Sequence, residues 1–240
     1  MTDQQQTEQL NETELAALRA WDTPTICNAL ELTSPERRAI GFTVEPLVCA
    51  FPDLAPIVGY ARTATIRSFQ PATRPAPDMR EQRLNYYRYV ANGNSPTIAI
   101  IQDLDGIHRA YGAFWGEVQS TIHQSLGCLG VVTDGSVRDI DACAPGFQFI
   151  ADRVGPSHAH VHLEDFDLDV NVSGMLVSSN DLIHADRHGA VVIPHDVARD
   201  IPEACKLLER REAVILDACR EPGFDVEALG RAMADSNEIH

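Results

Sequence analysis

The chain has 240 residues, 44% of them hydrophobic, and is long enough to bury a large core. Its 35 acidic and 19 basic side chains give a net charge of −16, which repels nucleic-acid backbones and anionic membrane surfaces. We therefore expect no nucleic-acid partner and no membrane partner. A small anionic substrate would need a local positive charge from an arginine or a metal ion.

Six cysteines are scattered along the chain without a Cys-x-x-Cys pair, and the N-terminus does not have the composition of a secretory leader. Both features favour reduced thiols in the cytoplasm. We expect residues 1–13, which are polar and rich in Gln and Glu, to form a disordered tail. No long linker or internal repeat interrupts residues 14–240, which predicts one domain.

The first half of the chain predicts an alternation of helices and strands. Helical spacing over 14–31, interrupted at Thr23-Pro24, predicts two short helices that meet at the proline. A strand over 58–66, a helix over 79–90 and a buried strand over 97–101 follow.

A βαβ unit is predicted in the middle of the chain. A helix from Trp115 to Leu126 leads into a β-branched apolar run over 129–132, which is typical of a strand buried on both faces. With the strand at 97–101, this order predicts two parallel neighbours and a right-handed crossover. Gly135 is expected to allow a tight turn after the second strand.

Arg138 and Asp139 follow that second strand, at the carboxyl end where α/β sheets bind ligands. Arg138 offers a rigid fork of donors and Asp139 a hard anionic oxygen, so the pair suits an anionic keto acid beside a divalent cation. The βαβ geometry brings the N–H groups of Gly116 to Gln119 to the same pocket, where they suit a carboxylate. By spacing alone the pair fits an ordinary helix start better, in which Asp139 favours the helix dipole and Arg138 is solvated.

Short strands are expected around residues 147–151, 170, 176 and 190–193, and helices over 196–219 and 225–234. This part of the chain also holds two histidine-rich segments.

The segment His158-Ala159-His160-Val161-His162 would place three imidazoles on one strand face, as a zinc or iron site or as a sheet edge. The segment from His184 to Gly189 carries His184, Asp186 and His188, whose side chains suit proton transfer near neutral pH. These three residues are candidates for a pocket, of this or a neighbouring subunit, or for a polar hairpin that satisfies its own hydrogen bonds.

Several stretches taken together match the pattern of one protein family. They are Trp115-Gly116-Glu117, Gly130-Val131-Val132-Thr133-Asp134-Gly135-Ser136-Val137-Arg138-Asp139, Asp181-Leu182-Ile183, Ala185-Asp186 and Gly189-Ala190-Val191-Val192-Ile193-Pro194. With them the chain resembles the RraA-like family from about Thr23 to about Pro194. That family includes the class II 4-hydroxy-4-methyl-2-oxoglutarate / 4-carboxy-4-hydroxy-2-oxoadipate aldolases and a regulator of ribonuclease E.

The resemblance implies an α/β/β/α sandwich of the swivelling phosphohistidine-domain type, in homotrimers or homohexamers with active sites between subunits. It implies that Asp139 binds Mg²⁺ or Mn²⁺ directly and that Glu117 holds one of the metal's waters. Arg138 would contact the pyruvoyl oxygen, and backbone amides following Gly116, at Val118 and Gln119, would take the carboxylate. A neighbouring subunit would add a carboxylate that the sequence does not place.

The function expected from these residues is a metal-dependent lyase that cleaves a 4-hydroxy-2-oxo acid to pyruvate, with Arg138 and Glu117 as catalytic residues. Oxaloacetate decarboxylation would be a side activity, because it needs only stabilisation of the enolate. Two alternatives stay open: a non-catalytic protein that binds and regulates an RNA-degrading enzyme, and a lyase for a sugar-acid derivative. The chain has Ser179-Asn180-Asp181 where many members have Pro-Gly-Asp, so the identity of the 2-oxo acid is also open.

Overall fold

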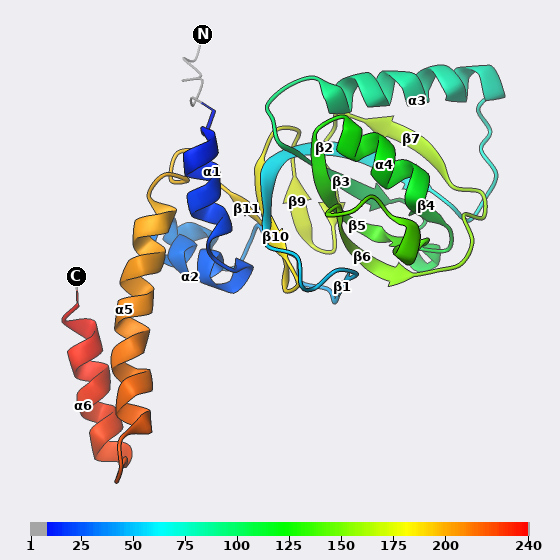
Figure 1. Ribbon diagram of the computed structural model, residues 1–240. Helices are drawn as coiled ribbons and strands as arrows, with labels where there is room; N and C mark the ends of the chain where they lie inside the picture. The colour runs from blue at the N-terminus through cyan, green and yellow to red at the C-terminus, as the bar shows by residue number, and fades with distance from the viewer. Residues whose placement is uncertain (1–8, 240) are drawn as a thin grey trace.

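The protein is described here from a computed structural model of residues 9–239 (Figure 1). Most of the expected tail, residues 1–8, lies outside the described residues, but the last part of that segment is packed against the fold. Leu10 is buried, and its N–H donates to Tyr60 Oη at 2.9 Å. Asn11 caps the first helix in a capping box with Glu14.

Helices lie at both ends of the chain and on one side of the sheet. They are α1 (Glu12–Arg19), α2 (Thr23–Thr33), α3 (Ala76–Ala91), α4 (Glu117–Ser125), α5 (Ile201–Arg220) and α6 (Val226–Asn237). The strands are β1 (Val48–Cys49), β2 (Ile57–Arg67), β3 (Thr97–Asp103), β4 (Ala113–Trp115), β5 (Cys128–Val137), β6 (Gln148–Val154), β7 (His162–Phe166), β8 (Val170–Val172), β9 (Met175–Val177), β10 (Leu182–Asp186) and β11 (Gly189–Ile193).

One mixed sheet of nine strands forms the body, in the order β1-β6-β5-β3-β2-β10-β11, with β4 beside β5 and β7 beside β2. The sheet curves around the small β8–β9 sheet and is nearly closed (Figure 1). The mixed α/β class predicted from the sequence is confirmed, whereas the four-layer sandwich stays a prediction.

The βαβ unit is present, because β3 and β5 are parallel neighbours and α4 connects them. The expected turn at Gly135 is wrong: β5 continues to Val137. Its second half is extended because β4 takes over as its parallel partner, pairing Ala113 with Ser136. The register shifts between Thr133 and Ser136, which indicates a bulge where the neighbour changes. Trp115 belongs to β4, so the helix begins at Glu117 and not at Trp115.

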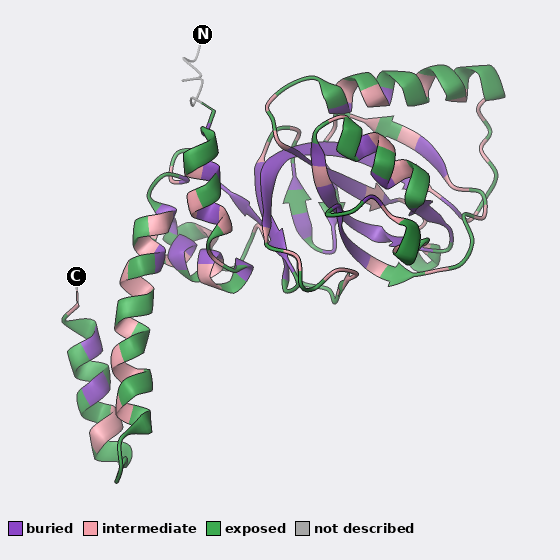
Figure 2. Ribbon diagram, viewed as in Figure 1, coloured by how far each residue is buried: buried purple, intermediate pink, exposed green. Residues whose placement is uncertain are grey.

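Each face of the sheet has its own core. Alternation along β5 directs Val131 to a cluster with Trp115 and the α3 residues, and Val132 to a cluster with β8 and β9. A third cluster joins α1, α2 and the start of α5 to the β10–β11 edge. Figure 2 shows β2, β5, β10 and β11 almost wholly buried, whereas most of the helical surface is exposed or intermediate. This arrangement holds the strand ends rigid.

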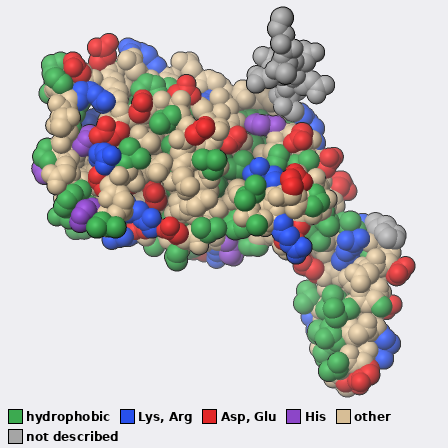
Figure 3. Space-filling model, turned by 180° about the vertical axis from the view of Figure 1, so that it is seen from behind, with side chains coloured by type: hydrophobic (Ala, Val, Ile, Leu, Met, Phe, Trp, Pro, Cys, Tyr) green, Lys and Arg blue, Asp and Glu red, His purple; other side chains and the backbone are tan. Residues whose placement is uncertain are grey.

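The two C-terminal helices pack against each other and project from the body (Figure 1). Hydrophobic side chains gather on this hairpin (Figure 3), and Leu216, Val226 and Met233 are at least half exposed. Between residues 9 and 239, none of the helices has the length and apolar character needed to cross a membrane.

Candidate functional site

The ends of β4 and β5 bring the central residues together. The strands are parallel and pair Trp115 with Val137, so the residues that follow them emerge side by side. The Arg138 N–H donates to the Trp115 carbonyl at 2.9 Å and locks the two ends. Asp139 then adopts a left-handed conformation, with φ 55° and ψ 39°, which few residues other than Gly, Asn and Asp take readily. Such a position commonly marks a functional turn.

Gly116 makes the close packing at this point feasible. Its backbone is extended, but a Cβ atom there would lie 2.5 Å from Asp139 Oδ2 and 3.1 Å from Arg138 Cγ. Only glycine fits without moving these side chains.

Asp139 is oriented by two donors. Its Oδ2 lies 3.4 Å from both Arg138 Nε and the Glu117 N–H. The Arg138 and Asp139 side chains remain 36% and 38% exposed, so a ligand can reach both. Within residues 9–239, no protein donor contacts the second carboxylate oxygen, Oδ1. That oxygen is therefore available to a cation.

The start of α4 supplies backbone donors to the same place. The first N–H groups of a helix have no intrahelical acceptor, and those of Val118 and Gln119 have none elsewhere in the described part of the chain. Val118 and Gln119 both line the pocket. Their N–H groups and the helix dipole favour an anionic group here.

Two aromatic hydroxyls hold α4, one at Gln119 near its start and one at His123 in its last turn. Tyr87 Oη donates to Gln119 Oε1 at 3.0 Å, and Tyr86 Oη lies 2.9 Å from His123 Nε2. The other ring nitrogen of His123 lies 2.8 Å from the Gln119 carbonyl. Burial lowers the pKa of His123 to about 4, so its ring is neutral at physiological pH. His123 thus anchors α4 without adding charge.

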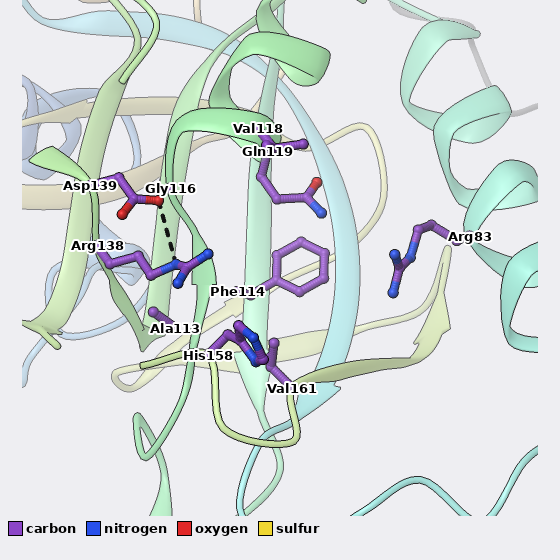
Figure 4. A pocket seen from close by; sticks show the side chains of 10 residues that line it. All are labelled: Arg83, Ala113, Phe114, Gly116, Val118, Gln119, Arg138, Asp139, His158 and Val161. Atoms are coloured by element: carbon purple, nitrogen blue, oxygen red, sulfur yellow. Dashed lines mark ion pairs between the residues drawn. The ribbon is translucent and has the colours of Figure 1, made fainter. Parts of the chain in front are cut away.

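The Arg138–Asp139 pair and the start of α4 line one cavity of about 310 Å³ (Figure 4). Arg83 reaches in from α3 and lies across the cavity from Arg138, with Phe114 between them. The full lining is Arg83, Ala113, Phe114, Gly116, Val118, Gln119, Arg138, Asp139, His158 and Val161. The sequence did not indicate Arg83 or Phe114 as site residues. An arginine on an amphipathic helix usually faces solvent, and a phenylalanine in a short strand usually packs in the core.

The donor set at Asp139 fits a hard cation. The fit rests on Oδ1, on the exposed carboxylate of the neighbouring Glu117, and on solvent access that leaves room for water ligands. One direct carboxylate with several waters is the coordination that Mg²⁺ prefers. No group of three or more His, Cys, Asp or Glu side chains lies in metal-binding proximity among the residues that the structure describes. A metal cage made of side chains alone is therefore not formed there.

The first histidine segment does not form a strand face. Ala159 has a left-handed φ of 44°, and β7 begins only at His162, so the expectation of three imidazoles on one face is wrong. His158 lines the cavity and His160 is exposed. His162 lies 3.0 Å from Glu164 Oε1 and 2.7 Å from the His160 carbonyl.

The second segment forms the β10–β11 hairpin and does not line the cavity at Arg138. His184 contacts Thr23 Oγ1 and the Trp21 carbonyl, each at 3.0 Å, and Asp186 Oδ2 accepts from the Thr23 N–H at 2.9 Å. Asp186 Oδ1 accepts from the His188 N–H at 2.8 Å. Burial lowers the pKa of His184 to about 4. His184 and Asp186 thus hold the start of α2 against the sheet edge.

Comparisons with known proteins place this fold and site in context. A family model described as RraA-like, Aldolase/RraA, matches residues 23–192. An uncharacterised protein of Methanocaldococcus jannaschii is 31% identical over 118 residues, which are 48% of this chain and 57% of that relative's length. This chain thus matches little more than half of that protein.

Two solved structures share the fold. An uncharacterised protein from Pseudomonas syringae pv. tomato str. DC3000 is 20% identical, with a TM-score of 0.70 over 95% of this chain and 96% of that one. Streptomyces coelicolor RraAS2, described as an unusual member of the RNase ES inhibitor RraA protein family, is 21% identical, with a TM-score of 0.66 over 85% of this chain and 96% of that one. Since the family model spans most of the chain and includes every residue of the cavity, the protein belongs to the RraA-like family.

Proposed function

We propose that the protein is a divalent-metal-dependent lyase that cleaves a 4-hydroxy-2-oxo acid to pyruvate and a carbonyl product. One observation carries the proposal: a guanidinium group, a carboxylate with a free oxygen and two unpaired helix N–H groups converge on one end of a cavity. A 2-oxo acid presents a carboxylate and a keto oxygen side by side. The carboxylate suits the two helix N–H groups, and the keto oxygen suits the guanidinium group.

In this proposal the N–H groups of Val118 and Gln119 bind the substrate's 1-carboxylate, and Arg138 donates to its 2-keto oxygen. When the C3–C4 bond breaks, negative charge develops on that oxygen, and a donor already in place stabilises it. Mg²⁺ or Mn²⁺ held by Asp139, with one of its waters on Glu117, would supply a Lewis acid at the same end of the cavity.

Cleavage also requires removal of a proton from the C4 hydroxyl. Glu117 is exposed at the first position of α4, where its carboxylate accepts that proton through a bridging water. Decarboxylation of oxaloacetate omits this step and needs only stabilisation of the enolate, by Arg138 and the metal ion. Oxaloacetate is therefore the simplest substrate to assay.

The proposal extends to assembly. At the Arg138–Asp139 end a second, shallower hollow adjoins the cavity, and its other lining residues are Ile140, Asp141, Val154, Gly155 and Pro156. A homotrimer or homohexamer in the cytoplasm, with a carboxylate from the neighbouring subunit at this hollow, would complete the site.

A metal-supplemented screen tests the function. Purified protein is incubated with Mg²⁺ or Mn²⁺ and a panel of 4-hydroxy-2-oxo acids, sugar-acid derivatives and oxaloacetate, and pyruvate release is measured. The proposal predicts metal-dependent release from oxaloacetate and from at least one hydroxy-oxo acid. Release of no pyruvate, together with tight and salt-sensitive capture of a ribonuclease E-type enzyme, would favour a regulator instead.

Metal binding is measurable without turnover. Electron paramagnetic resonance of Mn²⁺ should report binding by the wild type and loss of binding in Asp139→Asn. Asparagine also tolerates the left-handed conformation, so this variant removes charge with little strain.

A further inference from the structure

A second cavity, of about 750 Å³, lies on the other face of the sheet from Arg138. Residues two apart in a strand lie on the same face of the sheet, so Gln102 shares a face with Ile100, and Asp134 with Val132. The apolar core around β8 and β9 therefore borders polar groups at this cavity. Gln102 lies near the carboxyl end of β3, and Asp134 lies in the second half of β5. Neither Arg138 nor Asp139 lines this cavity.

Asp134 lines the cavity and lies within the register shift of β5. Its side chain is only 5% exposed, and Oδ1 accepts from the Asp103 N–H at 2.7 Å. Between residues 9 and 239, Oδ2 has no hydrogen-bond partner. Burial, together with repulsion from the nearby Asp103 carboxylate, raises the pKa of Asp134 to about 7. The Asp134 carboxyl group is thus largely buried, and no ion pair joins it to Arg109, the nearby cation whose charge favours its ionised form.

Ser173 is a second buried polar group without a partner in this cavity. It lies at the β8–β9 turn with a left-handed φ of 50°, is 3% exposed, and its Oγ has no hydrogen-bond partner among the described residues. Its carbonyl accepts from the Val44 N–H at 2.8 Å, so the turn is fixed. Buried polar groups are rarely left unpaired in native proteins, which indicates a ligand or water at this position.

The charges around the cavity select the kind of ligand. Arg109 pairs with Glu45 and lies 3.5 Å from Asp152, which also pairs with Arg153, so two arginines are balanced by two carboxylates. Asp103 is held by neutral donors, the Ala110 N–H and Ser68 Oγ. Above pH 7, where Asp134 is ionised, Asp103 and Asp134 therefore leave the cavity with an excess of negative charge.

An excess of negative charge favours a cation. The unpaired Ser173 hydroxyl in the same cavity requires a ligand with a second polar group, which an organic cation provides. We propose that this cavity binds a small organic amine, whose ammonium group pairs with Asp134 and whose remaining polar group reaches Ser173. The site is separate from that of the proposed lyase reaction.

Titration calorimetry tests the proposal with 4-aminobutan-1-ol as the probe and butane-1,4-diol as its neutral counterpart. The wild type should bind the amine saturably and the diol at least about tenfold more weakly, because the charge-assisted bond is lost. Asp134→Asn keeps the shape and the acceptor for the Asp103 N–H, and should also weaken binding of the amine about tenfold. Asp217→Asn removes the same charge from the exposed side of α5 and should bind like the wild type.

Two further variants keep the test decisive. Ser173→Ala removes only the hydroxyl and should weaken amine binding about threefold, which tests the site even if Asp134→Asn does not fold. Arg138→Ala should bind the amine like the wild type, whatever its effect on pyruvate release. Equal affinity for amine and diol, unchanged affinity in both Asp134→Asn and Ser173→Ala, or no saturable binding by the wild type would overturn the proposal.

Discussion

Replacement of Gly116 by alanine should separate activity from stability. The new Cβ would lie 2.5 Å from Asp139 Oδ2, whereas ordinary contact begins at 3.4 Å, so the carboxylate must move by the difference, 0.9 Å. The extended backbone at Gly116, with φ −172°, is open to alanine. The displaced atoms are ends of partly exposed side chains. We therefore expect the free energy of unfolding to change by less than about 1 kcal/mol.

The expected loss of activity is much larger. A displacement of catalytic groups by about 1 Å can reduce turnover about 100-fold, and here both the cation ligand and the guanidinium beside it are displaced. The assay is pyruvate formation from oxaloacetate at saturating Mg²⁺, with urea denaturation of the same preparation to measure stability.

Gly230 provides the matched control, since a Cβ added at this position in α6 meets no atom within 4 Å apart from its chain neighbours and the helix's own backbone. Gly230→Ala should leave turnover unchanged and increase stability by about 0.5–1 kcal/mol, because alanine favours a helix. A Gly116→Ala protein that keeps wild-type turnover would refute the placement of the active site.

Three further predictions address other parts of the structure. Asp186→Ala removes the buried acceptor of the Thr23 N–H, so the unfolding free energy should fall by about 2 kcal/mol in urea denaturation; a change below about 0.5 kcal/mol would contradict this role. Because the pKa of Asp134 is raised to about 7, the native state holds a proton that the unfolded chain releases near pH 4. Stability should therefore fall as pH rises from about 4 to 7, by at most about 1.4 kcal/mol per pH unit, and thermal unfolding of Asp134→Asn should show a weaker dependence than the wild type. Tyr87→Phe frees the Gln119 side chain, and steady-state kinetics should show KM for oxaloacetate increased about fivefold with kcat nearly unchanged; an equal loss in kcat would assign Tyr87 a different role.

Local sequence patterns predict the centre of the site because its residues are joined by one βαβ unit. The order of strand, helix and strand is sufficient to place Gly116 near Arg138, since parallel strands end at the same edge. The chemical roles of these residues stay predictions.

The rest of the cavity comes from elements far away in the sequence. Arg83 lies on α3 and His158 precedes β7, and no local pattern indicates that the fold brings either one to Arg138. The turn expected at Gly135 failed for a similar reason. A glycine inside a strand and one in a turn have the same sequence signal until the partner strand, β4, is known.

The histidines illustrate how burial decides between two interpretations. His184 and Asp186 have the residue types of a proton-transfer site, yet both are buried and bonded to the start of α2. The sequence shows the types and spacing of these side chains, but their hydrogen-bond partner Thr23 lies 161 residues from His184 and 163 residues from Asp186 along the chain. Their environment thus favours a structural role in this chain.

The most direct test compares pyruvate formation from oxaloacetate, at saturating Mg²⁺, by the wild type, Arg138→Ala and Asp139→Asn. Circular dichroism first establishes that all three are folded. The proposed site predicts metal-dependent turnover by the wild type and a loss of at least about 100-fold in each variant. Wild-type rates in either folded variant would contradict the assignment of these two residues to the reaction.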